Sequence, residues 1–291
     1  MLSLPWALTF ASTLLWAGFD AQRKALAARL SVPALSFWLS AVQLPGYALW
    51  ALLEGELRLS LDYFPPALAS IFLNIFANLA FLEAVRIAPL SQTVPLLSFT
   101  PVFVAVAGVP LLGEALAPGQ LGGVLLITLG ALSLAASPGE GGLRAVLVFF
   151  RSRGVRLMLW VALFWALTPV CDKMALAHAS VGVHGFLLSL GIALGMGFYF
   201  VSTGSLPELR VPRPVLPLLL LGGVSNVLAL GSQFLALRLL YVSLFEAAKR
   251  ALGLLLSLVL GRLWFGEELN ARKLVSGALM SLGVVFLLGL L

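Results

Sequence analysis

Long apolar runs recur along the whole chain, and they constrain its fold more than any other feature. Most are about 20 residues long, the length that an α-helix needs to cross the hydrocarbon core of a bilayer. Hydrophobic residues make up 61% of the 291 positions and charged residues only 10%, whereas soluble domains carry about 45–50% and about 25%. The mean hydropathy is +1.06. The sequence therefore predicts an all-α integral membrane protein and excludes soluble enzymes, nucleic-acid binders and secreted disulfide scaffolds.

Proline, glycine and charged residues divide these runs into ten predicted transmembrane helices. We expect the helices near residues 4–22, 33–53, 66–86, 91–112, 118–136, 155–174, 181–201, 216–237, 242–264 and 272–290. The longest connection, 137–154, leaves five helices on each side. Part of this connector is apolar but too short to span, so we expect it to lie along the membrane interface.

The two halves of the chain resemble each other. At offsets of 149 to 153 residues, uncommon residue types recur, including Trp16 and Trp165, Lys24 and Lys173, Asn74 and Asn226, Arg86 and Arg238, and the Gly-Glu pairs at 113–114 and 266–267. We therefore predict two five-helix repeats, 1–136 and 155–291, joined by the connector 137–154. Because five is odd, the second repeat enters the membrane in the opposite direction. Inverted repeats of this kind are common in secondary transporters, whose substrate site lies near the bilayer midplane.

Several motifs in this arrangement resemble the EamA type of the drug/metabolite transporter superfamily. They are WAG with a later lysine at Trp16 and Lys24, PLLSFTPVFVAVAGVPLLGE ending at Glu114, and EAAKRALGLLLSLVLGRLWFGEE ending at Glu268. The resemblance covers nearly the whole chain. It implies a ten-helix transporter in which helices of both halves line a central cavity and the last helix of each half packs at the periphery. It implies no particular substrate, because this family moves many.

One cluster of charged residues falls inside a predicted span, where charges are unfavourable and usually functional. Glu246, Lys249 and Arg250 lie close together on the ninth predicted helix. As a binding surface, they would hold an anionic or zwitterionic group, with Glu246 orienting the cations or titrating. Two structural interpretations stand beside this one. Glu246 and Arg250 form an internal ion pair, or the long side chains reach the interface from near the helix start.

Amide and indole side chains within spans are the next candidates for substrate contact. They are Asn74 and Asn78 on the third predicted helix, Asn226 and Gln233 on the eighth, and the repeat-related Trp16 and Trp165. Buried amides either join helices by hydrogen bonds or line a cavity. A tryptophan at membrane depth can stack on a flat or cationic ligand, although packing is the simpler explanation. Gln43 on the second predicted helix is read in the same way as the other amides.

Prolines inside predicted spans indicate where helices bend. Pro95 and Pro101 interrupt the fourth span and Pro169 the sixth, and each removes a backbone donor. We expect them to act as hinges between inward-open and outward-open states. Gly119 with Gly123, and Gly191 with Gly195, form GxxxG patterns, for which we favour close helix packing over a dimer interface.

The remaining polar residues give no enzyme signature. His178 and His184 lack partners at metal-ligand spacing, and no nucleotide-binding or hydrolase motif is present. We therefore predict no catalysis, no metal and no cofactor. Asp172 and Lys173 end the sixth span, a position more typical of interfacial charges than of gates. His184 is more often a packed or pore-lining residue than a ligand.

Charge distribution and family resemblance disagree about orientation. With the amino end outside, 13 of the 18 Lys and Arg residues fall on the cytoplasmic side, as the positive-inside rule prefers. The family is generally described with both termini cytoplasmic. The location that we expect is the bacterial inner membrane, where the chain is a monomer or homodimer in contact with the lipid bilayer.

Together these features predict a secondary transporter that works by alternating access. It would move a small metabolite or amphipathic organic compound, by export more readily than uptake, with possible coupling to protons or the membrane potential. Two alternatives remain open. The chain could be a lipid-carrier translocase, or a non-transporting intramembrane scaffold or enzyme subunit.

Overall fold

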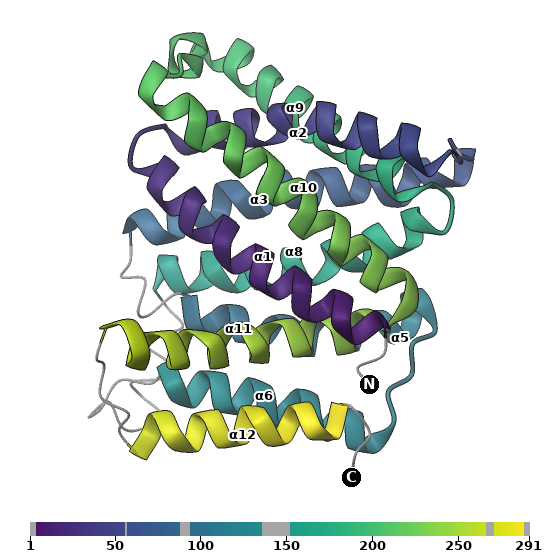
Figure 1. The fold of residues 1–291 in the computed structure, drawn as a ribbon, viewed down its shortest axis with the longest axis vertical. Helices are drawn as coiled ribbons and strands as arrows, with labels where there is room; N and C mark the ends of the chain where they lie inside the picture. Colours follow the sequence, from purple (N-terminus) through teal and green to yellow (C-terminus); the bar gives the residue numbers. More distant parts are fainter. Residues whose placement is uncertain (1–3, 56, 88–93, 136–151, 266–270, 288–291) are drawn as a thin grey trace. The chain divides into compact units, whose positions relative to one another are not determined.

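The computed structural model describes residues 4–55, 57–87, 94–135, 152–265 and 271–287. This part of the chain forms ten α-helices and four short 3₁₀ helices, and its one β-bridge, between Leu59 and Ala179, is isolated. The α-helices are α1 (Leu4–Ala27), α2 (Val32–Glu54), α3 (Phe64–Ile87), α5 (Thr100–Leu112), α6 (Pro118–Ala135), α8 (Arg153–Leu176), α9 (Val181–Thr203), α10 (Leu216–Leu239), α11 (Val242–Phe265) and α12 (Ala271–Leu287) (Figure 1). The 3₁₀ helices are η1 (Leu61–Tyr63), η2 (Val94–Phe99), η3 (Leu206–Leu209) and η4 (Arg213–Val215).

Each predicted span contains an observed helix with similar ends, but the fourth span is divided. There η2 precedes α5, and Pro101 lies in the first turn of α5, where its missing N–H removes no helical hydrogen bond. Four segments are long and apolar enough to cross a membrane, namely Leu61–Phe81, Arg153–Leu176, Val181–Thr203 and Arg213–Leu239. Four others are shorter and apolar. The number of ten spans therefore stays a prediction. Most of the expected connector 137–154, namely residues 137–151, lies outside the described residues.

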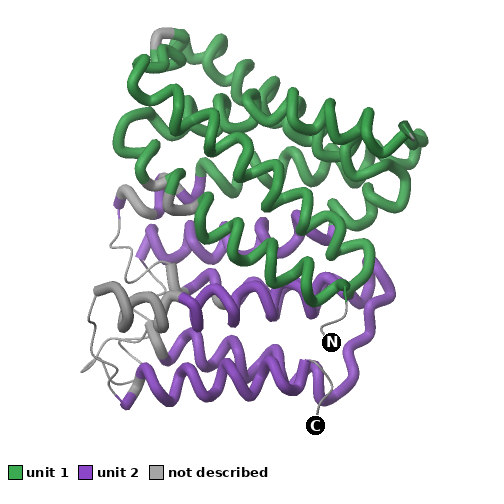
Figure 2. The backbone as a smooth tube through the Cα atoms, in the orientation of Figure 1, with its two compact units in different colours: residues 1–79, 171–240 green, residues 80–170, 241–291 purple. Residues whose placement is uncertain are grey.

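The chain divides into two compact units, each assembled from pieces of both halves (Figure 2). Unit 1 contains residues 1–79 and 171–240. Within it α1 packs on α10, and α2 packs on α9. One of its apolar clusters joins Phe19 and Leu26 of α1 with Leu35 and Leu39 of α2 and Leu219 of α10.

Unit 2 contains residues 80–170 and 241–291. Within it α6 packs on α12 and α5 packs on α11. The backbones of α6 and α12 approach closely: a Cβ added at Gly123 would lie 2.7 Å from the carbonyl oxygen of Gly283. Small residues permit this kind of contact between membrane helices. At Gly123, the Gly119–Gly123 pattern therefore allows α6 to pack closely on α12 of the same chain, as we expected.

The helix pairing is symmetric with respect to the two halves. The second, fourth and fifth helices of one half pack on their counterparts, as α2 on α9, α5 on α11 and α6 on α12. The first helix of each half pairs with the third helix of the other half. α1 packs on α10, and α8 packs on α3, with one apolar cluster between them in each unit. Such exchanged pairing is what two related repeats produce when each completes the other. The division into two repeats at the connector 137–154 stays a prediction from the sequence. Each compact unit contains helices from both predicted repeats.

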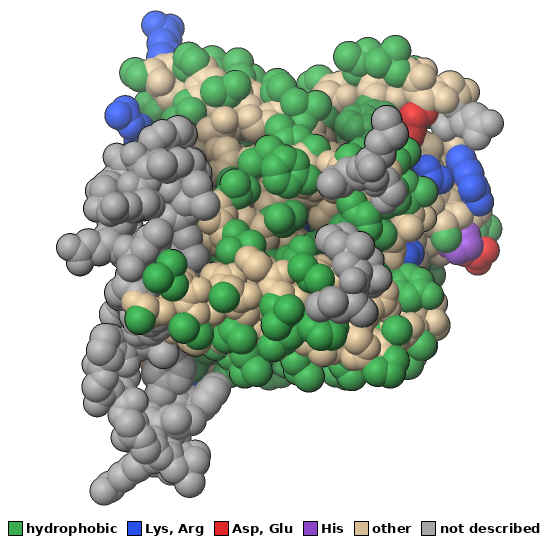
Figure 3. All heavy atoms as spheres, turned by 60° about the horizontal axis from the view of Figure 1, so that its bottom comes forward, with side chains coloured by type: hydrophobic (Ala, Val, Ile, Leu, Met, Phe, Trp, Pro, Cys, Tyr) green, Lys and Arg blue, Asp and Glu red, His purple; other side chains and the backbone are tan. Residues whose placement is uncertain are grey.

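Much of the described surface is apolar. Large hydrophobic side chains such as Leu52, Leu53, Phe198 and Leu194 are more than 60% exposed, and hydrophobic side chains cover much of the described face in Figure 3. Exposed apolar area on this scale marks a surface that another apolar phase covers. Together with the apolar helices, it identifies an integral multi-pass membrane protein.

Candidate functional site

Helix α11 carries the charged cluster, and a buried carboxylate fixes its start. The backbone N–H of Val242 donates to Glu114 Oε2 at 2.7 Å, and Glu114 is 4% exposed. The first N–H groups of a helix have no intrahelical partner and carry partial positive charge, so a carboxylate there is favourable. Glu114 belongs to the Gly-Glu turn that recurs in both halves. Its contact gives that turn a structural purpose, because it sets where α11 begins.

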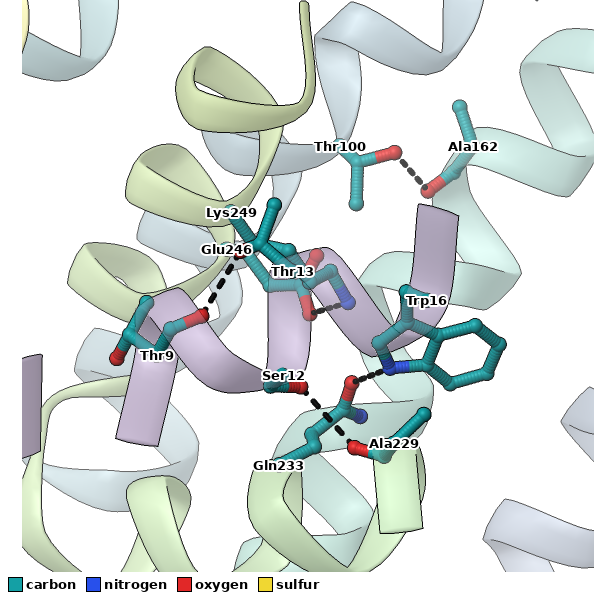
Figure 4. Close-up of polar contacts among 10 residues, drawn as sticks. All are labelled: Thr9, Ser12, Thr13, Trp16, Thr100, Ala162, Ala229, Gln233, Glu246 and Lys249. Carbon is teal, nitrogen blue, oxygen red and sulfur yellow. Dashed lines mark hydrogen bonds and ion pairs between the residues drawn. The ribbon is translucent and has the colours of Figure 1, made fainter. Parts of the chain in front are cut away.

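One turn further along α11, Glu246 and Lys249 form an ion pair. Lys249 Nζ donates to Glu246 Oε1 at 2.7 Å. The side chain of Lys249 is 21% exposed and that of Glu246 is 4% exposed. The ammonium group also lies 5.1 Å from the centroid of the Phe245 ring, within reach of a cation–π interaction. Figure 4 shows the pair with the acid and amine ends together.

Arg250 follows directly and is half-buried. The cluster therefore presents two cations and one anion on the buried first half of α11. The sequence interpretation paired Glu246 with Arg250, whereas the ion pair seen in the structure joins Glu246 to Lys249. The observed contact is therefore an internal ion pair with a different cation. This ion pair still allows the cations to bind a substrate, because the carboxylate of Glu246 holds the Lys249 ammonium in position to contact an anionic group as well.

In unit 1, Trp16 and Gln233 meet across α1 and α10. The indole Nε1 of Trp16 donates to Gln233 Oε1 at 3.1 Å, and nearby Ser12 donates to the carbonyl oxygen of Ala229 at 3.0 Å (Figure 4). These bonds join a helix of the first half to one of the second. The contact supports the interpretation of Gln233 as interhelical glue and leaves the indole face of Trp16 for packing against Phe19.

Two of the predicted amides carry a buried oxygen without a partner. Gln43 is 4% exposed, and its Oε1 has no hydrogen-bond partner among the described residues. Asn226 shows the same pattern. It is 8% exposed, and its Oδ1 has no hydrogen-bond partner among the described residues. A buried carbonyl of this kind is unfavourable unless water or a ligand completes it. Asn74 and Asn78, by contrast, donate to backbone oxygens one turn earlier, those of Ser70 at 3.1 Å and Asn74 at 2.8 Å.

The remaining predicted residues are packed or lie at helix breaks. Trp165 lies 5.3 Å from Phe81, ring centre to ring centre, in an apolar cluster of unit 2. Pro95 lies inside η2 and Pro101 at the start of α5, so both mark the observed break in the fourth span. Pro169 lies inside α8, directly before the chain passes from unit 2 to unit 1 after Val170.

Asp172, which we expected at the membrane interface, is buried inside the protein, where its residue is 1% exposed. Ser70 of α3 donates to Asp172 Oδ1, and the same oxygen lies 3.4 Å from His184 Nε2 of α9. His184 Nδ1 is in turn 3.1 Å from the hydroxyl of Tyr63. The packed-histidine interpretation of His184 is confirmed, since this residue is fully buried. No sequence pattern connects these four residues, which are up to 121 positions apart.

Lys173 acts on the end of a neighbouring helix rather than as a simple interfacial charge. Its Nζ donates to the carbonyl oxygen of Leu240 at 2.6 Å, and Leu240 caps α10. The last carbonyl groups of a helix carry partial negative charge and favour a cation. Among the described residues, no group of three His, Cys, Asp or Glu side chains could hold a metal ion.

Fold, apolar surface and helix pairing together define a polytopic helical membrane protein. The model of the EamA-like transporter family matches this chain twice, over residues 4–136 and 152–289. The chain therefore belongs to the EamA-like transporter family, and its two-repeat pattern follows from the two matches.

Other comparisons bear on the fold alone. One crystal structure matches with a TM-score of 0.74 at 19% sequence identity, covering 98% of this chain and 96% of that one. At this identity the likeness shows a shared fold and gives no information about the substrate. A search of curated proteins finds no match.

Proposed function

We propose that this chain is a secondary transporter that moves a small metabolite or amphipathic organic compound across a bacterial inner membrane by alternating access. Membership of a transporter family supports the class of activity. The observation that carries the recognition site is the Glu246–Lys249 ion pair beside Arg250 on the buried part of α11. Export rather than uptake, and driving by protons or the membrane potential, belong to the same proposal.

The charged cluster favours a substrate with an anionic or zwitterionic group. Lys249 and Arg250 supply donors that pair with a carboxylate or phosphate, and Arg can do so with two parallel hydrogen bonds. Glu246 holds Lys249 in place through a 2.7 Å contact and offers an acceptor for an amine. In lipid such a cluster persists only where protein or water surrounds it, as expected of a transport pathway.

Amides and prolines have supporting roles in this proposal. Asn226 brings a buried oxygen that needs a donor, which a polar solute would supply. Trp16, Gln233, Asn74, Asn78 and Trp165 orient the helices that carry the pathway. Pro95, Pro101 and Pro169 lie where helices break or change unit, and there they would absorb the dihedral changes of opening and closing.

A ligand-stabilisation screen tests the site. Purified protein is heated with amino acids, nucleosides, organic anions and cationic drugs, and the compounds that raise its melting temperature are measured for binding. Lys249→Ala and Arg250→Ala should each weaken binding of an anionic or zwitterionic hit at least about tenfold, because a charge-assisted hydrogen bond contributes about 1.5–3 kcal/mol.

The matched control is Arg213→Ala, which removes the same charge from an exposed position in η4. It should leave affinity unchanged. Equal affinities in wild type, Lys249→Ala and Arg250→Ala would remove α11 from the site. Lipid-linked sugars are added to the screen as a further class, and stabilisation by these compounds alone would favour a lipid-carrier translocase instead.

A further inference from the structure

A second group of buried polar residues lies in unit 1, apart from the charged cluster of α11. Asp172, His184, Tyr63 and Ser70, here called the Asp–His network, have exposed fractions of 1%, 0%, 1% and 0%. They come from α8, α9, η1 and α3. The contacts run from Ser70 Oγ to Asp172 Oδ1, from that oxygen 3.4 Å to His184 Nε2, and from His184 Nδ1 3.1 Å to Tyr63 Oη.

The geometry allows two protonation states that differ by one proton. In the first, His184 is neutral with its proton on Nε2, facing the Asp172 carboxylate, and Tyr63 donates its hydroxyl proton to Nδ1. The network then carries one negative charge. In the second, His184 holds a proton on each nitrogen, Nδ1 donates to Tyr63 Oη, and the network is neutral. No bond other than N–H or O–H forms or breaks.

The negative state lacks a fixed counter-charge. Among the described residues, the polar partners of Asp172 are Ser70 and His184, and neither is permanently cationic. The neighbouring Lys173 donates to the end of α10. A buried carboxylate without a permanent partner strongly favours gaining a proton or a cation. The separation of 3.4 Å is long for a hydrogen bond, so the pair has room to tighten when His184 becomes charged.

The groups around the network are apolar or uncharged. The His184 ring packs 4.6 Å from that of Phe234 on α10. Asn74 of α3 donates weakly to Ser70 at 3.4 Å. Asp172 acts electrostatically on Cys171, its neighbour in α8, and on Tyr47 of α2.

Tyr47 is fully buried, and its hydroxyl has no hydrogen-bond partner among the described residues. At the start of α9, Glu54 accepts from the N–H groups of Val181 and Gly182. In the part of the chain that the structure describes, the contacts of the network therefore include no permanent positive charge that would fix its protonation.

The network also lies on the two helices that continue from one compact unit into the other. α8 changes unit between Val170 and Cys171, and α3 changes unit between Leu79 and Ala80. Asp172 and Ser70 join these helices directly. A charge change at this contact alters the bond between α3, α8 and α9, and so provides a physical link between protonation and rearrangement of the helices.

We propose that the Asp–His network is the proton-binding site that couples transport to a proton gradient. This inference rests on the proposed transport function and names its driving ion. Each transport cycle would load one proton between Asp172 and His184 and release it on the other side of the membrane.

Histidine NMR tests proton binding without any substrate. The chain has two His residues, so His178→Gln leaves His184 as the one ¹⁵N-histidine signal in lipid nanodiscs. We expect the His184 signal to change from the neutral Nε2–H tautomer to the doubly protonated ring in one step as the pH is lowered. Asp172→Asn should lower the proton affinity at least about tenfold, and Tyr63→Phe should change the tautomer ratio. A His184 that keeps one protonation state throughout, or titrates alike in Asp172→Asn, would overturn the proposal.

Flux under a pH gradient tests coupling. The readout in proteoliposomes is the ratio of flux with an imposed pH gradient to flux without one, for a compound from the stabilisation screen. Wild type should give a ratio well above 1, and Asp172→Asn and His184→Gln should give about 1. The control Glu83→Gln changes a carboxylate of α3 that lies outside the Asp–His network and pairs with the exposed Arg153; it should keep the wild-type ratio. Equal ratios in all four proteins would overturn coupling, whereas the absence of flux of every compound would overturn the transport function itself and coupling with it.

Discussion

At the residue scale, charges near helix ends have more definite tasks than their positions in sequence suggest. Glu114 binds the first N–H of α11, and Glu54 binds the first N–H groups of α9. Lys173 binds the carbonyl oxygen of Leu240, the residue that caps the end of α10. Each charge has the sign that the helix end favours. In an apolar environment water cannot hydrogen-bond to the N–H and C=O groups at helix ends, so these charged side chains do so instead.

The contact of Glu114 leads to a stability prediction. Glu114→Ala leaves the buried N–H of Val242 without its acceptor and should lower stability by about 1–2 kcal/mol. Glu114→Gln keeps an acceptor oxygen and should lose less than half as much. Unfolding of the purified variants in lipid–detergent mixtures measures both. Equal losses in Ala and Gln variants would mean that the oxygen is not what holds the start of α11.

Sequence reasoning found the residues of α11 but not the Asp–His network. Glu246, Lys249 and Arg250 are neighbours on one helix, so spacing alone brings them together. Asp172 meets Ser70 and His184 only after three helices pack. Its place at the end of an apolar run suggested the interface, because the sequence does not show that Asp172 packs against Ser70 of α3 and His184 of α9.

At the scale of elements, hydropathy predicted where helices lie because each apolar run must satisfy its own backbone hydrogen bonds in lipid. The fourth span departs from this pattern, since η2 and α5 replace one continuous helix. Pro95 and Pro101 predicted that the helix is interrupted here. They did not predict that the first part is a 3₁₀ helix, which depends on how η2 packs on α6.

The contact between α6 and α12 gives a paired prediction. Gly123→Ala places a Cβ 2.7 Å from the backbone oxygen of Gly283, and neither backbone can yield cheaply, so stability should fall by about 1–3 kcal/mol. Gly122→Ala, one residue earlier, meets no atom within 4 Å and should be neutral or slightly stabilising, because Ala is the better helix former. Thermal unfolding of the two variants measures the difference. The same loss at both positions would contradict the close approach.

At the scale of the whole molecule, the repeats and the compact units divide the chain differently. The sequence offsets and the family matches separate the halves near the connector, while each unit draws helices from both halves. Sequence similarity reports ancestry of segments, whereas compactness reports which helices pack. The exchanged pairing of first and third helices could not be predicted from either half alone.

Charge distribution makes a prediction about orientation. The positive-inside rule places the connector 137–154 in the cytoplasm and both termini outside. In a Cys171→Ser background, Ser137→Cys should then resist a membrane-impermeant maleimide in intact cells and react after permeabilisation. A cysteine at the carboxyl terminus should react in intact cells. The reverse pattern would support the orientation that is usual for the family.

Solute counterflow tests the central claim, that this chain moves a small solute across a membrane. Proteoliposomes are loaded with an unlabelled compound from the stabilisation screen, diluted, and given a trace of the labelled compound outside. We predict transient accumulation of label above its equilibrium level, lost in Lys249→Ala and retained in Arg213→Ala. Label that never exceeds the level in protein-free liposomes, although the compound binds, would contradict the account and favour a non-transporting membrane protein.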